Sequence, residues 1–598
     1  MIRDHVNALR KRMEVLDLDA YIVPTADPHQ SEYLPDYYKT RQFITGFTGS
    51  AGTAVITKKD AGLWTDSRYF LQAAEELRHT PFTLYKMGTE DPTLEDYLIH
   101  NTPPFGKIGF DGACMSLSMF KKLKQSLGSR ALIYDVDYIT DIWQDRPALP
   151  DQPAFALDEK YTGRSIEDKL RILRFMMADR EVDFTFIAAP EDVNYLFNLR
   201  GWDVQCTPVI LSYALISKDQ AILFIAPEKL SDPLKDQLHQ AGVWTMDYDM
   251  AMTKVEALPT RGTIYLDPDR TSVLTFKTLP AGLRVQTGIN LTSLMKAIKN
   301  EVEIENIKEA FLKDGVALMR FFNWIEMGAR SETVDEKLAV EKLRECRKKQ
   351  DNYLEDSFEA IIGYGANAAI VHYNPMNNRN PATLKGSGLL LVDSGGQYLE
   401  GTTDITRTYA MGPTSPEEKK DYTLVLKAHI AGMTAVFPKG TTGAYLHFLT
   451  RAPLFQEGMD YQHGTGHGVG HVLSCHEGPQ SISARGDEVE IVPGMVTSME
   501  PGLYIEGKHG IRTESIMLCR EKETSEWGTF YEFEPLTWVP IDTRPLDLSL
   551  LSDFEIDWLN TYNKTCFEKL SPRMKDEGDD LLYLKTRCQP VKKISSGR

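Results

Sequence analysis

The sequence predicts a mixed fold, α/β in its first half and α+β in its second, built from two similar α/β modules and one larger domain. Its 598 residues are enough for about three or four domains. In the first half a set of residues recurs at one constant offset, as Leu9-Arg10, Met13 and Asp19 and again as Leu173-Arg174, Met177 and Asp183. From Leu294 onward the pattern changes to long helical periodicity and then to glycine-rich short strands.

The recurring residues indicate the same kind of unit twice. In each copy an amphipathic stretch ends at the aspartate and continues into an apolar strand, at residues 20–23 and 184–188. A polar loop and a Tyr-Leu pair then follow in both copies. Helix-then-strand units can resemble one another by chance, but this order of features favours a duplicated module.

We predict three domains. The first, residues 1–155, alternates the strand-like runs TAVIT, GLWTD and KIGFD with helical stretches and ends at the proline-rich passage RPALPDQP. The second, residues 156–293, contains the strand segments PVILSYALI and AILFI. The third, residues 294–598, begins with apolar residues at three- and four-residue spacing, which predicts one or two long helices.

The composition excludes several classes of protein. Hydrophobic residues make up 42% and charged residues 25%, which is ordinary for a globular chain. A net charge of -18 repels phosphate and argues against nucleic acid as a partner. The seven cysteines are scattered without a CxxC pair, as in a reducing compartment. With no signal-peptide pattern and no long apolar run, we expect a cytoplasmic protein without a membrane partner.

Two aspartates follow apolar strands in the third domain. Asp393 ends GLLLVDSGG and Asp404 lies in GTTDITRTY. If the two strands form a hairpin centred between Tyr398 and Leu399, the carboxylates oppose one another and a cation is needed between them. Taken alone, the pair also fits one carboxylate in a turn and one on a solvated face.

Two glutamates repeat the arrangement. Glu500 ends the strand MVTSMEPGLY and Glu514 lies in GIRTESIML. A hairpin centred on Gly507 places these two acids opposite each other. Two such hairpins in one glycine-rich domain favour a metal site over chance.

A histidine cluster lies between the two acid pairs. The segment HGTGHGVGH carries His463, His467 and His471 at four-residue spacing, and His476 follows in SCHEGP. Each alternating glycine would cost a helix about 1 kcal/mol relative to alanine, so we predict extended backbone. Residues four apart then share a face. A lone histidine is more often structural, but this cluster indicates a metal-binding or catalytic role for at least two of them.

The donor set favours two metal ions. Four carboxylates contribute a charge of about −4, which balances two divalent cations. Oxygen-rich sets with a single imidazole suit Mn²⁺ better than the sulfur-rich sets of structural zinc, although Zn²⁺ or Co²⁺ remains possible. Such a pair holds and acidifies a bridging water and polarises a substrate carbonyl, which is the chemistry of a two-metal hydrolase.

The five candidate ligands occur in the order and context of those of the pita-bread metallopeptidases. They are Asp393, Asp404, His467, Glu500 and Glu514. More narrowly, the chain resembles the long, three-domain cytosolic form of aminopeptidase P. The resemblance covers nearly the whole chain and includes HQSEYLPDYYKTRQFITGFTGSAGTAVIT, LWTDSRYFLQAA, YLFNLRG and EPLTWVPID. It implies two creatinase-like N-terminal domains, a pita-bread catalytic domain with a C-terminal extension, and a homodimer. We expect the N-terminal modules to narrow access to the cleft and to contribute to the dimer.

The resemblance also implies residue roles. Asp393 would bind one metal through both oxygens, Asp404 and Glu514 would bridge, and His467 and Glu500 would complete the second metal's shell. Glu500 would also act as general base. Three non-ligand histidines, His372, His463 and His476, would position the scissile carbonyl, stabilise the oxyanion and move protons. Arg512 would orient the neighbouring carboxylates.

The activity implied is removal of the first residue from peptides with proline second, through attack of a hydroxide that bridges the two metals. Proline-containing peptides are then the expected partners. The chain departs from the family pattern at Ala366, His471 and Cys475, none of which removes an expected ligand. Prolidase shares the five ligands but has only one N-terminal module. Methionine aminopeptidase lacks both N-terminal modules, and creatinase lacks the full set of ligands. A non-catalytic metal-binding scaffold of the same fold is the alternative from another class.

Overall fold

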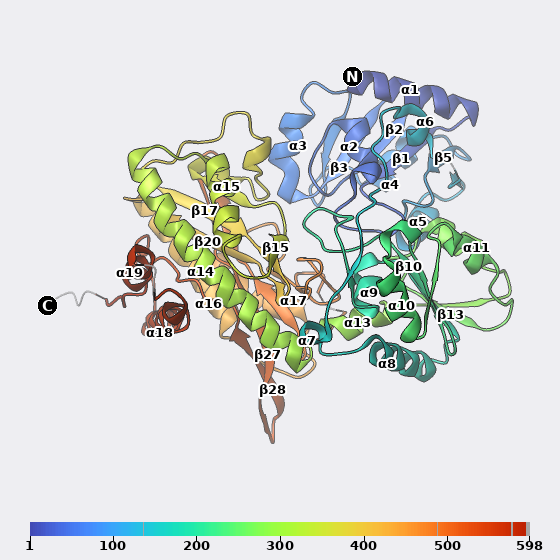
Figure 1. Cartoon of the computed structure of the whole chain (residues 1–598). Coiled ribbons are helices and arrows are strands. Elements are labelled where there is room, and N and C mark those ends of the chain that lie inside the picture. The colour runs from blue at the N-terminus through green and yellow to red at the C-terminus, as the bar shows by residue number, and fades with distance from the viewer. Residues whose placement is uncertain (136, 487, 576–577, 594–598) are drawn as a thin grey trace. The chain divides into compact units, whose positions relative to one another are not determined.

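The computed structural model describes residues 1–135, 137–486, 488–575 and 578–593. The chain divides into two compact units (Figure 1). The first consists of Met1–Glu159 with Arg164–Lys296, and the second of Lys160–Gly163 with Ala297–Arg598. In the described ranges, none of the helices combines the length and the apolar character needed to cross a membrane.

The first unit contains two six-stranded sheets of identical topology. The first sheet has the order β4-β3-β2-β1-β5-β6. Its strands are β1 (Ala20–Pro24), β2 (Thr53–Thr57), β3 (Ala61–Thr65), β4 (Thr83–Lys86), β5 (Lys107–Phe110) and β6 (Ala131–Ile133). The second has the order β12-β11-β10-β8-β13-β14. Its strands are β8 (Phe184–Ile187), β10 (Tyr213–Ser217), β11 (Ala221–Phe224), β12 (Val243–Met246), β13 (Thr263–Leu266) and β14 (Arg284–Thr287). The predicted duplication of the module is therefore confirmed.

The residues that recur in the sequence have equivalent positions. Helices α1 (Ile2–Val15) and α8 (Ile166–Asp179) precede the central strands, and their recurring leucines and methionines are buried. Asp19 accepts a hydrogen bond from the Lys107 amide, and Asp183 accepts one from the Thr263 amide. Each aspartate thus binds the first residue of the parallel neighbour strand, which explains why it recurs.

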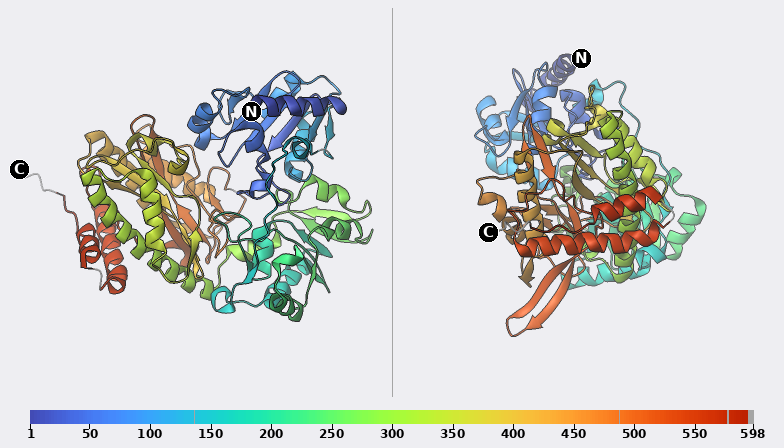
Figure 2. Two further views of the ribbon diagram at one scale, coloured as in Figure 1. Left: turned by 45° about the horizontal axis from the view of Figure 1, so that its top comes forward. Right: turned by 90° about the vertical axis from the view of Figure 1, so that its left-hand side faces the viewer.

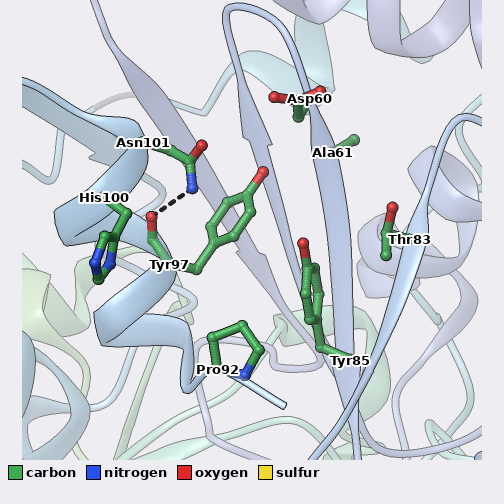
Figure 3. Close-up of a pocket in the computed structure, with 8 residues that line it drawn as sticks. All are labelled: Asp60, Ala61, Thr83, Tyr85, Pro92, Tyr97, His100 and Asn101. Carbon is green, nitrogen blue, oxygen red and sulfur yellow. Dashed lines mark hydrogen bonds between the residues drawn. The ribbon is translucent and has the colours of Figure 1, made fainter.

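A small pocket lies at the β3–β4 side of the first sheet (Figure 3). It has a volume of about 320 Å³, and its lining includes Asp60, Tyr85 and Tyr97. The two tyrosine rings are tilted against each other with centroids 5.4 Å apart. The pocket lies in the first unit and contains none of the predicted site residues.

The second unit begins with the predicted long helical region. Helix α13 (Leu291–Ala297) belongs to the first unit up to Lys296, and α14 (Glu301–Ser331) follows it. Asn300 and Glu303 form a capping box at the start of α14, which satisfies the free amides of its first turn. Helix α15 (Glu336–Arg347) packs beside α14.

Short sheets carry the predicted site residues. The three-stranded sheets are β15 (Tyr353–Asp356) with β18 (Gly396–Tyr398) and β19 (Gly401–Thr402), and β16 (Ile361–Tyr364) with β17 (Leu389–Ser394) and β20 (Ile405–Ala410). The four-stranded sheet contains β21 (Val436–Pro438), β28 (Gly528–Pro535), β27 (Ser515–Ser525) and β24 (Val496–Met499). Two-stranded pairs are β22 (Gly466–His467) with β23 (Ser481–Ile482), and β25 (Gly502–Ile505) with β26 (His509–Arg512). The β27–β28 hairpin projects from the rest of this unit (Figure 2).

Helices cover the sheets and supply the core. Helices α14, α15 and α16 (Pro416–Met433) contribute to one buried cluster with β16, β17 and β20, in which Phe322 stacks on Tyr409 at 4.0 Å. Helix α17 (Gly443–Phe455) packs against α16 and β23. The C-terminal helices α18 (Asp553–Leu570) and α19 (Gly578–Arg587) pack against α14 (Figure 2).

Candidate active site

The first aspartate pair does not have the predicted register. Asp393 in β17 lies opposite Thr406 in β20, not opposite Asp404. The chain turns at residues 399–400, where Tyr398 pairs with Gly401, so the hairpin centre lies one residue later than predicted. Asp404 falls in the break between β19 and β20. The prediction of directly opposed aspartates is therefore wrong.

The second acid pair has the predicted register. Met499 pairs with Ser515 and Gly502 pairs with Arg512, so Glu500 and Glu514 face each other between these pairs. The hairpin turns at Gly507, whose φ of +74° is a left-handed conformation that suits glycine. Both acids lie in the break between these two pairs of strands, at the same level of the hairpin, so their side chains extend from it at the same place.

The structure brings the predicted ligand residues into one cluster. Three groups of side chains each offer ligand atoms within 4.8 Å of one another. The first group is Asp393, Asp404 and Glu514, the second is His467, Glu500 and Glu514, and the third is Asp404, His467 and His476. His467 Nε2 lies 3.4 Å from Asp404 Oδ2 and 3.5 Å from Glu500 Oε1. Asp404, His467 and Glu514 each belong to two of the groups, so the three groups form one continuous cluster.

The surroundings raise the pKa values of both glutamates of the cluster. Burial, followed by the charges of Asp404 and Glu500, raises the pKa of Glu514 well above its usual range. Burial also raises the pKa of Glu500, against the opposing effect of His467. The cluster therefore concentrates acidic groups without enough positive charge from the protein to balance them.

The two aspartates differ in their electrostatics. Burial raises the pKa of Asp393, although the neighbouring Arg512 opposes the shift. Burial would also raise the pKa of Asp404, but the hydrogen bond and charge of His467 outweigh it and the pKa is lowered. Among the described residues, Asp393 Oδ1 is buried without a hydrogen-bond partner. An orphaned carboxylate oxygen beside three further acids and one imidazole fits a pair of divalent cations.

Arg512 and Thr406 hold the acids in place. The Arg512 guanidinium donates to Asp393 Oδ2 and, at 3.1 Å, to Thr406 Oγ1. The Thr406 hydroxyl donates to Glu514 Oε2 at 2.8 Å. The sequence analysis did not identify Thr406. It lies two residues after Asp404, and strand periodicity could have indicated it.

Two more supporting residues were missed. Ser498 Oγ accepts a hydrogen bond from the His467 amide at 2.9 Å and lies 3.3 Å from Glu500 Oε1, to which it donates. The Cys475 thiol donates to Asp404 Oδ2 at 3.2 Å. Burial raises the pKa of this thiol well above its usual range, so it stays protonated as a donor.

The histidine segment is non-helical, as predicted, with a short strand only at Gly466–His467. His463 Nε2 hydrogen-bonds the Tyr504 hydroxyl at 2.8 Å, and its Nδ1 lies 4.0 Å from Glu500 Oε2. The His476 ring packs edge-on against His467, with centroids 4.3 Å apart. Both His463 and His476 therefore adjoin the acid cluster. Tyr504, which also accepts from Arg512 at 2.7 Å, had no signal in the sequence.

The remaining histidines have different surroundings. His372 is half-buried and follows the 3₁₀ turn Gly365–Ala369, which packs on β17 and β26. His471 is buried outside the ligand groups, where Nε2 bonds the Glu400 carbonyl at 3.0 Å and Nδ1 lies 4.0 Å from Glu303.

Family models cover most of the chain. Two matches to the creatinase/prolidase N-terminal domain span residues 5–142 and 145–303. Metallopeptidase family M24 matches residues 305–521, and the C-terminal region of that peptidase matches residues 529–591. The chain thus has two creatinase-type N-terminal domains followed by a pita-bread metallopeptidase domain.

Full-length relatives agree with these models. Aminopeptidase P2 of Arabidopsis thaliana is 38% identical, over 93% of this chain and 84% of that protein. A probable Xaa-Pro aminopeptidase P of Laccaria bicolor is 39% identical, over 98% of this chain and 92% of that protein. The crystal structure of X-prolyl aminopeptidase from Caenorhabditis elegans, a cytosolic enzyme with a di-nuclear active site, matches with a TM-score of 0.94 and 32% identity over 99% of this chain and all of that one. This chain therefore belongs to the aminopeptidase P (Xaa-Pro aminopeptidase) family of M24 metallopeptidases.

Proposed function

We propose that the protein is an exopeptidase that uses two divalent metal ions to remove the first residue from peptides with proline in the second position. The observation that carries the proposal is the convergence of four carboxylates and His467 within ligand distance, in a chain whose full-length relatives are Xaa-Pro aminopeptidases. The completeness of the donor set also supports catalysis over a non-catalytic scaffold, because no expected ligand is missing.

We assign the metal ligands as Asp393, Asp404, His467, Glu500 and Glu514. Bound divalent cations supply an acidified water nucleophile and polarise the scissile carbonyl. Asp404 and Glu514 would contribute to the sites of both cations, because both lie in the group with Asp393 and each also lies in a group with His467. Asp393 would bind one cation through both oxygens, of which Oδ2 also accepts from Arg512 and Oδ1 has no hydrogen-bond partner among the described residues.

The residues around the cluster move protons and orient the substrate. Glu500 accepts the proton of the attacking water, a role supported by its position beside His467 and His463. His463 donates to the oxyanion or to the leaving proline nitrogen, since it lies beside Glu500 and is held by Tyr504. His476, which packs on His467, and His372 orient the scissile carbonyl.

A peptide assay tests the function. Chelator-stripped protein is incubated with Ala-Pro-Ala, Ala-Ala-Ala and Ala-Pro, with and without Mn²⁺, and products are identified by mass spectrometry. We expect release of alanine from Ala-Pro-Ala alone, and only with metal. Preferential cleavage of Ala-Pro would assign a prolidase, and no cleavage of any peptide would support the scaffold. Glu500→Gln serves as the inactive control.

We also propose that the protein is a homodimer through helix α17. Its outer face carries exposed apolar residues at helical spacing, with exposed fractions of 72% for Tyr445, 57% for Phe448, 46% for Leu449 and 43% for Phe455. Burying a large apolar side chain contributes about 2 kcal/mol, so this face favours association. Sedimentation should give a dimer for the wild type and a 67.6 kDa species for Phe448→Glu. A monomeric wild type would contradict the proposal.

Three finer assignments complete the picture. We propose Mn²⁺ as the metal, because oxygen-rich ligands with one imidazole suit it. We propose a cytoplasmic location, which the scattered free cysteines and the cytosolic relative support. We also propose domain boundaries at residues 155/156 and 293/294.

A further inference from the structure

Arg451 of helix α17 forms a buried clamp on the segment that carries His463. Residues 460–464 have neither helix nor strand, so side chains contribute to fixing their backbone. Arg451 is only 5% exposed and donates to the carbonyl oxygens of Tyr461 at 2.6 Å and His463 at 2.7 Å. The same guanidinium also donates to the Asp460 carboxylate.

The clamp also fixes an aromatic ring beside His463. The Arg451 guanidinium lies over the Tyr461 ring, 3.8 Å from its centroid. The same ring also contacts His463, at 4.8 Å between centroids and 40° between planes. A planar fork that binds two carbonyls and stacks on a ring is chemistry that arginine provides and lysine does not.

A second side chain of α17 holds the other end of the segment. His447, one turn before Arg451, bonds the Thr465 hydroxyl at 2.9 Å. The Thr465 carbonyl in turn accepts from the Glu500 amide at 2.8 Å. The inner face of α17 therefore determines where His463 and Glu500 lie relative to each other.

We propose that Arg451 is a positioning residue for catalysis, which holds His463 at its distance from Glu500 without contacting substrate or metal. The inference depends on the catalytic role proposed above for His463. It assigns no ligand to Arg451, so its loss should leave metal binding intact.

A double-mutant cycle tests the inference on the metal-loaded full chain. Arg451→Gln should lower kcat for Ala-Pro-Ala about 100-fold with little change in KM, since a small misplacement of a catalytic group costs that much. In a His463→Ala background the same substitution should cost less than about threefold, because the group that it positions is absent. Isothermal titration should still give two metal ions per chain at wild-type affinity.

Two further variants guard against a loss of folding. Arg451→Lys keeps the charge beside Asp460 but not the fork, and should lose about tenfold in kcat with an unchanged circular dichroism spectrum. Arg544→Gln is the matched control, because it removes a charged clamp on Glu326 and Asp542 in the same unit, away from the candidate site. It should leave kcat unchanged.

The outcomes separate the two proposals. Equal losses from Arg451→Gln in the wild-type and His463→Ala backgrounds, or loss of metal binding, would overturn the positioning role alone. Wild-type turnover in His463→Ala would overturn the role of His463, and the inference with it.

Discussion

Replacing Glu514 by glutamine should abolish activity and yet not destabilise the metal-free protein. Glu514 belongs to two of the three ligand groups, so its loss reduces the donor set of both cations. The three acids that remain carry a charge of about −3, which is one short of the −4 that balances two divalent cations. We expect one bound metal ion per chain in place of two, and turnover at least 1000-fold lower.

The effect on stability has the opposite sign. Burial and the charges of Asp404 and Glu500 raise the pKa of Glu514 in the folded state well above its value in the unfolded chain. A carboxyl group whose folded pKa is raised loses its proton first in the unfolded chain. Above about pH 4.3 the folded state therefore loses stability, on the order of 1 kcal/mol per pH unit, until the folded pKa is reached. Glutamine cannot ionise, so the substitution removes this loss.

The two effects can be measured on the same samples. Metal content is determined by mass spectrometry and turnover with Ala-Pro-Ala, and apo-protein unfolding is followed in urea at pH 5 and pH 7. The apo variant should be at least as stable as the apo wild type at pH 7, with a smaller difference at pH 5. Two bound metal ions with turnover within threefold of wild type would refute the ligand assignment, and a much less stable apo variant would refute the electrostatic reasoning.

Three more predictions follow from the same structure. Metal at 100 times its dissociation constant should raise the free energy of unfolding by about 2.7 kcal/mol, which urea titrations with and without Mn²⁺ would measure, and equal stability would contradict a folded-state site. Burial, then Arg407, lowers the pKa of the fully buried His429, so its own contribution to the free energy of unfolding should fall by roughly 1 kcal/mol per pH unit as pH drops below about 6.5. In urea unfolding between pH 7 and pH 5, the stability of the wild type relative to His429→Phe should fall by that amount. Cys475→Val should weaken metal binding about tenfold in isothermal titration, whereas Cys475→Ser keeps a donor to Asp404 and should bind metal as the wild type does. Equal metal affinities of Cys475→Val and the wild type would show that the thiol does not support metal binding.

Strand reasoning succeeded where one turn residue determined the register. Gly507 has a positive φ that marks the turn, and counting outward from it gives the observed pairing of Glu500 with Glu514. Between Asp393 and Asp404 the chain makes two short strands in a separate sheet before it returns. The turn at Leu399 and Glu400 has no glycine to mark it, so a one-residue error in its centre moved each pairing by two.

The residues that support the candidate site also differ in whether a local sequence pattern predicts them. Thr406 and Ser498 are two residues from Asp404 and Glu500, and the strand period predicts that they share a face with the acids. Tyr504 lies on β25 and Arg451 lies on α17. Both contact the His463 residue because the tertiary fold brings these elements together, and no local sequence pattern indicates this. The sequence thus predicts the candidate ligands and Arg512, and it misses the orienting groups that only the tertiary fold brings to them.

The position of Glu514 depends on the C-terminal region as well as on its own strand. Arg407, which is 2% exposed, donates to the Glu514 carbonyl and to the Val539 carbonyl at 2.9 Å, and contacts the Tyr562 hydroxyl at 2.7 Å. Tyr562 lies on α18 and donates in turn to the Thr537 carbonyl at 2.8 Å. A buried guanidinium is costly unless every donor is satisfied, and here the partners come from β20, from Glu514 and from the segment that leads to α18. The C-terminal extension is therefore part of the scaffold that holds mutually repelling acids at fixed distances, which explains why the candidate metal site needs helices from beyond the catalytic sheets.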